Sequence, residues 1–177
     1  MRALLLAAGF LVSVSAMAQT PQSITEVFDS SVSGPERACL AVAKAMPANK
    51  YSFIPVRGEF KGVRSFAQLT KHIAVENYRS GAALLGEKIP VDTGEHDNGP
   101  DSIKTKEEVI KFLRESFSYF HKAVSTTSDK NLMEIVSYGG NARVARLQVL
   151  TAAISHPWDI YGQMVEYVRM NGIDPQK

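Results

Sequence analysis

Two histidines, His72 and His156, lie within segments whose apolar residues recur at helical spacing. Imidazole is the commonest side-chain ligand for metals, and it also exchanges a proton near neutral pH. Around His156, the residues Val149, Ala153 and Ile160 fall on the same side of the helix, so its ring needs a partner inside the protein. Either each ring makes a structural hydrogen bond in the core, or the histidines hold a metal ion or another small ligand.

Glu76 follows His72 by four residues, so both side chains lie on one face of the predicted helix. On that helix Glu76 falls between Leu69 and Ala83, inside the apolar arc. A carboxylate in such a position is paired, hydrogen-bonded, protonated or bound to a cation. Two interpretations remain open. In the first, His72 is a metal ligand and Glu76 orients its ring through a hydrogen bond. In the second, Glu76 extends to the edge of the bundle and His72 is a hydrogen-bonded histidine of the core.

Four helical segments must position these residues, and no internal repeat or low-complexity tract interrupts them. The pattern predicts helices over residues 24–45, 65–85, 105–124 and 142–172, with capping boxes opening the second and third. It also indicates a short extended piece at residues 135–138. Because long connectors separate the helices, we expect an all-α fold, a four-helix bundle with long crossover connectors rather than a tight up-and-down bundle.

The third and fourth helices have the clearest apolar faces. The core stripe of the third helix consists of Val109, Leu113, Phe117, Phe120 and Val124. The fourth helix is apolar around most of its circumference, with Trp158 in the arc, and we expect it to be mostly buried. The narrow stripe left for water consists of Gln148, Thr151, Ser155, Asp159, Glu166 and Arg169. An apolar face this broad is compatible with a homodimer and equally with an ordinary buried helix.

The N-terminus has the features of a secretory signal peptide. An apolar run over residues 3–14 precedes the tripeptide Ala16-Met17-Ala18, which has the small-x-small form of a signal-peptidase site. We therefore expect residues 1–18 to be removed and residues 19–177 to form one exported domain, periplasmic or secreted. The apolar run is too short to span a bilayer, so no transmembrane segment is expected.

The composition excludes several classes of function. The chain carries 20 basic and 18 acidic residues and no basic run that could follow a phosphate backbone, so nucleic-acid binding is not expected. Cys39 is the only cysteine, which excludes an intramolecular disulfide. It lies among Ala38, Leu40 and Val42, a setting typical of a small buried hydrophobic residue rather than of a nucleophile.

Three stretches of the sequence resemble the DinB-like (DinB/YfiT) superfamily. They are residues 66–74 around His72, residues 46–55 in the connector, and residues 156–175, where Tyr-Gly-Gln is followed by a tyrosine, an arginine and Asn-Gly. The resemblance covers essentially all of residues 19–177. It implies a DinB-like four-helix bundle domain, commonly dimeric, in which three histidines hold a divalent metal.

The resemblance assigns two of these three ligand positions to His72 and His156. The third position falls at Ile160, four residues after His156, and isoleucine cannot bind metal. Glu76 is the nearest substitute by helix geometry, and it would complete a two-histidine, one-carboxylate set suited to zinc, nickel or iron. His121 is the other candidate third donor, although it lies off the core stripe of its helix, a position more typical of a surface histidine.

Three classes of function remain open. The first is a binding protein with a small ligand or a weakly held divalent metal between the second and fourth helices, in a cavity lined by His72, Glu76, His156, Tyr161 and Tyr167. The second, implied by the resemblance, is a metal-dependent transferase or isomerase. The third is a non-catalytic dimeric interaction scaffold. The missing third histidine and the lack of a Ser-His or Cys-His constellation favour the binding protein.

Overall fold

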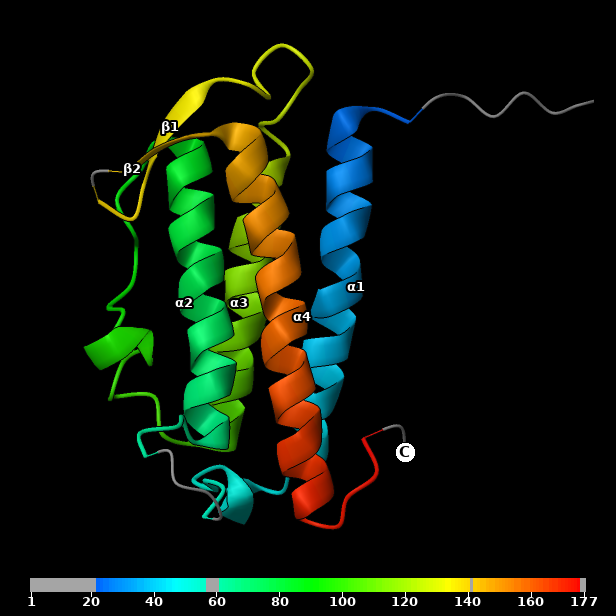
Figure 1. The fold of residues 1–177 in the computed structure, drawn as a ribbon, viewed down its shortest axis with the longest axis vertical. Coiled ribbons are helices and arrows are strands. Elements are labelled where there is room, and N and C mark those ends of the chain that lie inside the picture. Colours follow the sequence, from blue (N-terminus) through cyan, green and yellow to red (C-terminus); the bar gives the residue numbers. More distant parts are fainter. Residues whose placement is uncertain (1–21, 57–60, 141, 176–177) are drawn as a thin grey trace, which may run out of the picture.

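The computed structural model describes residues 22–56, 61–140 and 142–175. In these ranges four helices form a bundle, and a short hairpin forms the one sheet (Figure 1). The helices are α1 (Ile24–Ala45), α2 (Phe66–Leu85), α3 (Lys106–Val124) and α4 (Arg146–Met170). The smaller elements are the 3-10 turns η1 (Ala48–Lys50) and η2 (Glu95–Asp97) and the strands β1 (Ile135–Tyr138) and β2 (Ala142–Ala145). The expected all-α bundle is confirmed.

The predicted signal peptide, residues 1–18, lies outside the described residues. Within the described ranges, no helix is both long enough and apolar enough to cross a membrane. Export and cleavage therefore stay predictions from the sequence.

Side-chain caps begin three of the helices. Ser23, Ser65 and Thr105 each accept a hydrogen bond from the backbone N–H three residues on, and the side chain there accepts one from the cap residue's own N–H. Each capping box thereby satisfies two N–H groups that would otherwise lack a partner at the helix start. At the other end of α2, Gly86 takes the left-handed conformation with φ 70°, which ends the helix.

The chain crosses the bundle between α1 and α2 and between α3 and α4, whereas α2 and α3 are neighbours. Helices α1 and α4 run in one direction, and α2 and α3 run in the other (Figure 1). Helix α2 packs against α3 and α4, and α1 packs against the same two helices, so α1 and α2 occupy opposite corners. Because α3 starts at the same end as α2, the connector over residues 86–105 returns along the length of α2. The expectation of long crossover connectors is confirmed.

Helix α2 is buried on almost every side. The connector over residues 86–105 covers part of it, and the ammonium group of Lys71 donates to the Pro100 carbonyl in this connector at 2.8 Å. On the side facing α3, Asn77 donates to the hydroxyl of Ser116 at 3.1 Å. These buried polar side chains keep hydrogen-bond partners, as buried groups require.

The core between the helices contains the whole stripe that the sequence assigns to α3. All five of its residues are buried: Val109, Leu113, Phe117, Phe120 and Val124. From α1, Cys39 is buried as well, and its thiol lies 3.6 Å from the carbonyl of Pro157 in α4. Burial raises the pKa of the Cys39 thiol to about 12. Cys39 is therefore an inert core residue, as expected from its neighbours.

The last helix begins four residues later than the sequence pattern predicts. Residues 142–145, expected to be its first turn, form β2 and pair antiparallel with β1, so that Ile135 lies opposite Ala145. Gly139 takes φ 56° in the turn between the strands, a conformation that glycine adopts without strain. Strand pairing and the burial of Ala145 outweigh the helix propensity of alanine here. The extended piece expected at residues 135–138 is confirmed.

Helix α4 is also less buried than predicted. Trp158 is 44% exposed, and Ala152 and Gln163 are exposed beside it. The physical reason is that α4 packs mainly against α1 and α2, which cover one side of the helix and leave the other to solvent. The buried side carries Ile160 and Met164, together with the inner face of His156.

Candidate functional site

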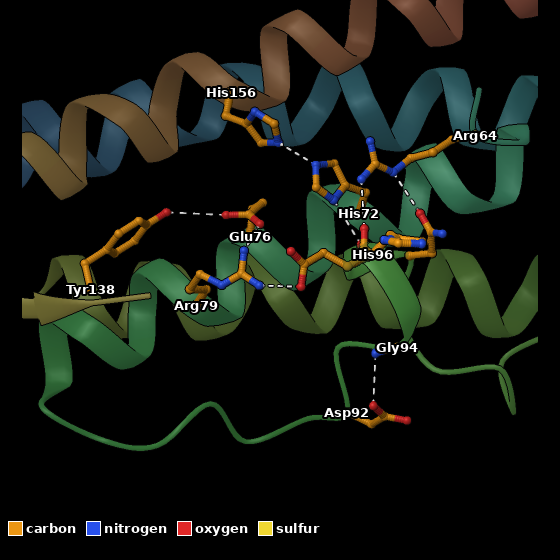
Figure 2. Close-up of polar contacts among 11 residues, drawn as sticks. Arg64, His72, Glu76, Arg79, Asp92, Gly94, His96, Tyr138 and His156 are labelled. Atoms are coloured by element: carbon orange, nitrogen blue, oxygen red, sulfur yellow. Dashed lines mark hydrogen bonds and ion pairs between the residues drawn. The ribbon is translucent and has the colours of Figure 1, made fainter. Parts of the chain in front are cut away.

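His72 of α2 and His156 of α4 face each other across the interface between these helices (Figure 2). Their Nε2 atoms lie 3.2 Å apart, and the two ring planes are nearly perpendicular, at 83°. His72 is 8% exposed, and His156 is half-buried. The fold thus brings together the two histidines that the sequence singles out, although 84 residues separate them along the chain.

The connector over residues 86–105 decides which nitrogen of His72 carries the proton. Nδ1 of His72 lies 2.9 Å from the backbone carbonyl of Asp97. Because a carbonyl oxygen only accepts hydrogen bonds, Nδ1 donates, and Nε2 of the neutral ring has a lone pair. In the protein alone, the Nε2–H group of His156 donates to that lone pair. A metal ion or a ligand's hydrogen-bond donor would use the same lone pair.

The surroundings of His72 favour its neutral form. Burial lowers the pKa of the imidazole below its usual 6.5, and the positive charge of Arg64 and the proximity of His156 lower it further. The hydrogen bond to Asp97 and the negative charge of Glu76 act in the opposite direction without reversing the shift. Neutral imidazole is the form that coordinates a metal or accepts a hydrogen bond.

Glu76 lies near the histidines, but its carboxylate has other partners. It forms an ion pair with Arg79, one turn further along α2, and accepts a hydrogen bond from the Tyr138 hydroxyl at 3.3 Å. Arg79 also bonds to the carboxylate of Asp97 at 2.5 Å (Figure 2). The group that orients His72 is therefore the Asp97 carbonyl and not Glu76. Both nearby carboxylates are paired with the single guanidinium of Arg79.

Arg64 places a further positive charge beside the histidine pair (Figure 2). Its Nε donates to the Asn98 side-chain oxygen at 2.8 Å, and its Nη2 donates to the His96 carbonyl at 2.9 Å. Neither acceptor carries a charge, and no ion pair of Arg64 occurs among the residues that the structure describes. Coulomb repulsion from this guanidinium opposes the binding of a second cation at His72.

His121, the other candidate third donor, lies at a different interface. Its Nδ1 is 2.5 Å from the carboxylate of Asp29, and its Nε2 is 3.2 Å from that of Glu36. Both carboxylates belong to α1, so His121 links α3 to α1. Both ring nitrogens of His121 therefore face carboxylates of α1, away from the histidine pair.

The two tyrosines expected to line the site have different surroundings. The hydroxyl of Tyr167 donates to the Arg64 carbonyl at 3.1 Å, and both residues line a cleft of about 580 Å³ together with Gln68 of α2 and Gln163 of α4. Tyr161 instead packs edge-on against the exposed Trp158, with ring centroids 5.6 Å apart. Tyr167 therefore belongs to the region next to the histidine pair, and Tyr161 belongs to the outer side of α4.

Two of the residues present have a spacing that fits neighbouring ligands of one metal ion. Two nitrogens bound to one tetrahedral zinc ion lie roughly 3.3 Å apart, so the 3.2 Å separation of the two Nε2 atoms suits neighbouring ligands. Ile160, where the resemblance places the third ligand, is 3% exposed and packs in the apolar core. In the described part of the chain, no group of three or more His, Cys, Asp or Glu residues could hold a metal ion. The donor set is incomplete.

Comparison with known proteins confirms the resemblance. A family model described as the DinB superfamily matches residues 36–164. The chain belongs to the DinB superfamily. A crystal structure of a DinB-like protein from Bacillus cereus ATCC 10987 matches with a TM-score of 0.66 and 19% identity, over 86% of this chain and 95% of that chain. A crystal structure of a conserved protein from Enterococcus faecalis matches with a TM-score of 0.66 and 15% identity, over 84% of this chain and 97% of that chain.

At these identities, the similarity to the two solved structures concerns the fold alone. No curated protein matches the chain. Membership in the DinB superfamily therefore establishes the helical architecture, and the chemistry has to be argued from the residues of this chain.

Three residues of this DinB-superfamily site were missed by sequence reasoning. Arg79 had an available signal, because it follows Glu76 by three residues, a spacing at which opposite charges pair on a helix. Asp97 acts on His72 through its backbone carbonyl, so its residue type carries no signal for the contact. Arg64 reaches the site from the connector before α2, whose path the sequence pattern does not specify.

Proposed function

We propose that this DinB-superfamily protein is a binding protein that holds a small ligand or a weakly bound divalent metal between α2 and α4. One observation carries the proposal: the Nε2 atoms of His72 and His156 converge to 3.2 Å, and the Asp97 carbonyl leaves the His72 lone pair directed at this point. An imidazole nitrogen with a lone pair can coordinate a metal or accept a hydrogen bond from a ligand. The neighbouring cleft of about 580 Å³ lies within the size range of small-molecule sites.

Three features favour weak binding over catalysis. A third protein ligand is lacking at Ile160, and the charge of Arg64 repels a cation. The thiol of Cys39 is buried with a pKa of about 12, so it does not serve as a nucleophile. Zinc, nickel or iron would gain only two imidazole donors, and we expect the metal to exchange readily with solvent.

The metal content of the purified protein tests the proposal. Protein purified without chelator should contain much less than one metal ion per chain by mass spectrometry, and it should bind zinc weakly in calorimetric titrations. His72→Ala should abolish this binding. Ile160→His adds an imidazole one turn after His156 and should tighten zinc binding by about tenfold or more. Ile160→Asn is the matched control, since it introduces a polar side chain without an imidazole.

Three results would contradict the proposal. Near-stoichiometric metal in the parent protein, lost in His72→Ala, would indicate a recruited third donor and a metal-dependent transferase or isomerase. Zinc binding that persists in His72→Ala would place the metal elsewhere. No ligand or metal effect at either histidine, together with a homodimer in sedimentation, would indicate a dimeric interaction scaffold.

A further inference from the structure

Arg146, the first residue of α4, is a buried cation with few protein partners. It is 8% exposed. Its Nη1 donates to the carbonyl of Leu84, in the last turn of α2, at 2.9 Å. Its Nε is buried and has no hydrogen-bond partner among the described residues. A guanidinium carries five N–H donors, so most of the hydrogen-bonding capacity of Arg146 is unused by the protein.

The charge of Arg146 is also not neutralised by an acidic side chain. None of the ion pairs in the described part of the chain includes it. The C-terminal carbonyls of α2 offset part of the charge, because a helix C-terminus carries roughly half a negative elementary charge. The rest stays uncompensated in a buried position, where an unpaired charge is destabilising. An anion that accepts hydrogen bonds from this guanidinium would neutralise the charge and use its free N–H donors.

A cleft of about 400 Å³ adjoins Arg146, between the C-terminal end of α2 and β1. Figure 1 shows the hairpin beside this end of α2, where α4 also begins. Six of the ten residues that line the cleft are apolar: Ala82, Ala83, Leu84, Leu85, Ile135 and Val136. A cleft that combines apolar side chains with one buried cation suits a small ligand with an apolar tail and one anionic end.

We propose that this cleft binds a small carboxylic acid with an apolar tail. The carboxylate accepts hydrogen bonds from Arg146, and the tail lies against Leu84 and Ile135, the latter 54% exposed in the protein alone. Glu87 also lines the cleft, but its carboxylate accepts a hydrogen bond from the Tyr119 hydroxyl at 3.1 Å. The negative charge of Glu87 favours a singly charged ligand over a phosphate dianion.

Titration with hexanoate and 1-hexanol tests the proposal, because the two probes match in length and differ in charge. Binding is followed through the amide chemical shifts of residues 84–87 and 135–137 in NMR spectra of the protein. We expect hexanoate to bind about tenfold more tightly than 1-hexanol, since a hydrogen bond between charged groups is the added interaction. Acetate has the carboxylate but no tail to bury, and it should bind more weakly than hexanoate.

Variants of the charged residues test whether the preference for hexanoate over 1-hexanol depends on Arg146. Arg146→Met should equalise the affinities for hexanoate and 1-hexanol. Arg146→Lys keeps a charge and a donor for the Leu84 carbonyl, so it provides a second folded variant, with a reduced preference for hexanoate. Arg143→Met, on the exposed side of β2, is the matched control and should change neither affinity. Glu87→Gln removes the competing negative charge and should tighten hexanoate binding.

Equal affinity of the parent protein for the two probes would overturn the proposal, as would an unchanged preference in Arg146→Met. Destabilisation by Glu87→Gln without any gain in hexanoate affinity would also overturn it, because Glu87 would then be the partner of Arg146 in solution. His72→Ala should leave hexanoate binding unchanged. A failure at this cleft therefore remains distinct from a failure of the histidine site.

Discussion

His72 derives its chemical character from contacts that are not on its own helix. The Asp97 carbonyl orients the ring and places the proton on Nδ1, and burial favours the neutral form. The ring therefore presents a lone pair to His156 on α4. Meanwhile Arg79 binds the carboxylates of Glu76 and Asp97, which removes the two nearest acidic groups from the site. The residues closest to the pair support two nitrogen donors and no third ligand.

The lowered pKa of His72 makes the stability of the protein depend on pH. In the unfolded chain the imidazole takes up a proton near pH 6.5, whereas in the folded protein it does so at lower pH. Between these two values the unfolded state binds more protons, so the free energy of unfolding falls as the pH drops below about 6.5. Each unit by which the fold lowers this pKa corresponds to a loss of about 1.4 kcal/mol in the free energy of unfolding at low pH. Urea unfolding between about pH 5 and pH 8 should show this loss.

Substitution of His72 by asparagine should remove its part of the pH dependence. His96→Asn is the control, because it removes an imidazole whose side chain is 80% exposed. If His72→Asn and the parent protein lose the same stability between pH 8 and pH 6, the imidazole of His72 is not held in the neutral form by the fold.

At the scale of elements, the connector over residues 86–105 acts as part of the site. It runs along α2, supplies the Asp97 carbonyl to His72, and supplies acceptors to Lys71 and Arg64. Its path depends on Gly94, which takes φ 68° and ψ 178°. A Cβ atom at Gly94 would lie 2.1 Å from the Gly99 carbonyl oxygen, so another residue cannot be accepted without movement of the connector.

Gly94→Ala should therefore destabilise the protein by about 1–3 kcal/mol and displace the Asp97 carbonyl from His72. Unfolding measurements give the first effect, and the ¹⁵N chemical shifts of the imidazole give the second. Gly162→Ala on the exposed side of α4 is the control, because a Cβ there meets nothing within 4 Å. It should be neutral or stabilise by up to about 1 kcal/mol. An unchanged imidazole spectrum in Gly94→Ala would show that the connector does not set the tautomer of His72.

At the scale of the whole molecule, the crossover topology separates two polar features. The histidine pair lies at the α2–α4 interface, and Arg146 lies where α4 begins beside the end of α2 and the hairpin (Figure 1). Both depend on α2, which contacts α3, α4 and β1. Belonging to the DinB superfamily accounts for this architecture, whereas the isoleucine at position 160 belongs to this chain.

The export prediction also concerns the whole chain. Signal-peptidase cleavage after Ala18 should give a protein that begins at Gln19, which N-terminal sequencing of the extracytoplasmic fraction would detect. Ala18→Arg should block cleavage, because the peptidase requires a small residue there, and Ala18→Ser should not. Recovery of the chain from the cytoplasm with Met1 or Arg2 at its start would contradict the prediction.

The sequence by itself determined the helices, most of their ends and the stripe of core residues in α3. These features depend on interactions within a few residues, such as the capping boxes at Ser65 and Thr105 and the left-handed Gly86. It also singled out His72 and His156, because a histidine on an apolar helical face needs a partner. The resemblance to the DinB superfamily also depends on the sequence alone, because it is carried by short stretches such as residues 66–74 and 156–175.

Only the tertiary structure decided what those histidines contact. The Asp97 carbonyl is 25 residues from His72, and the ring of His156 is 84 residues away. Strand pairing with β1 likewise converted residues 142–145 from the expected helix into β2. Burial of α4 depended on which helices cover it, so Trp158 is exposed although its neighbours are apolar. In each case contacts between distant parts of the chain outweigh local preference, and a pattern of neighbouring residues carries no information about them.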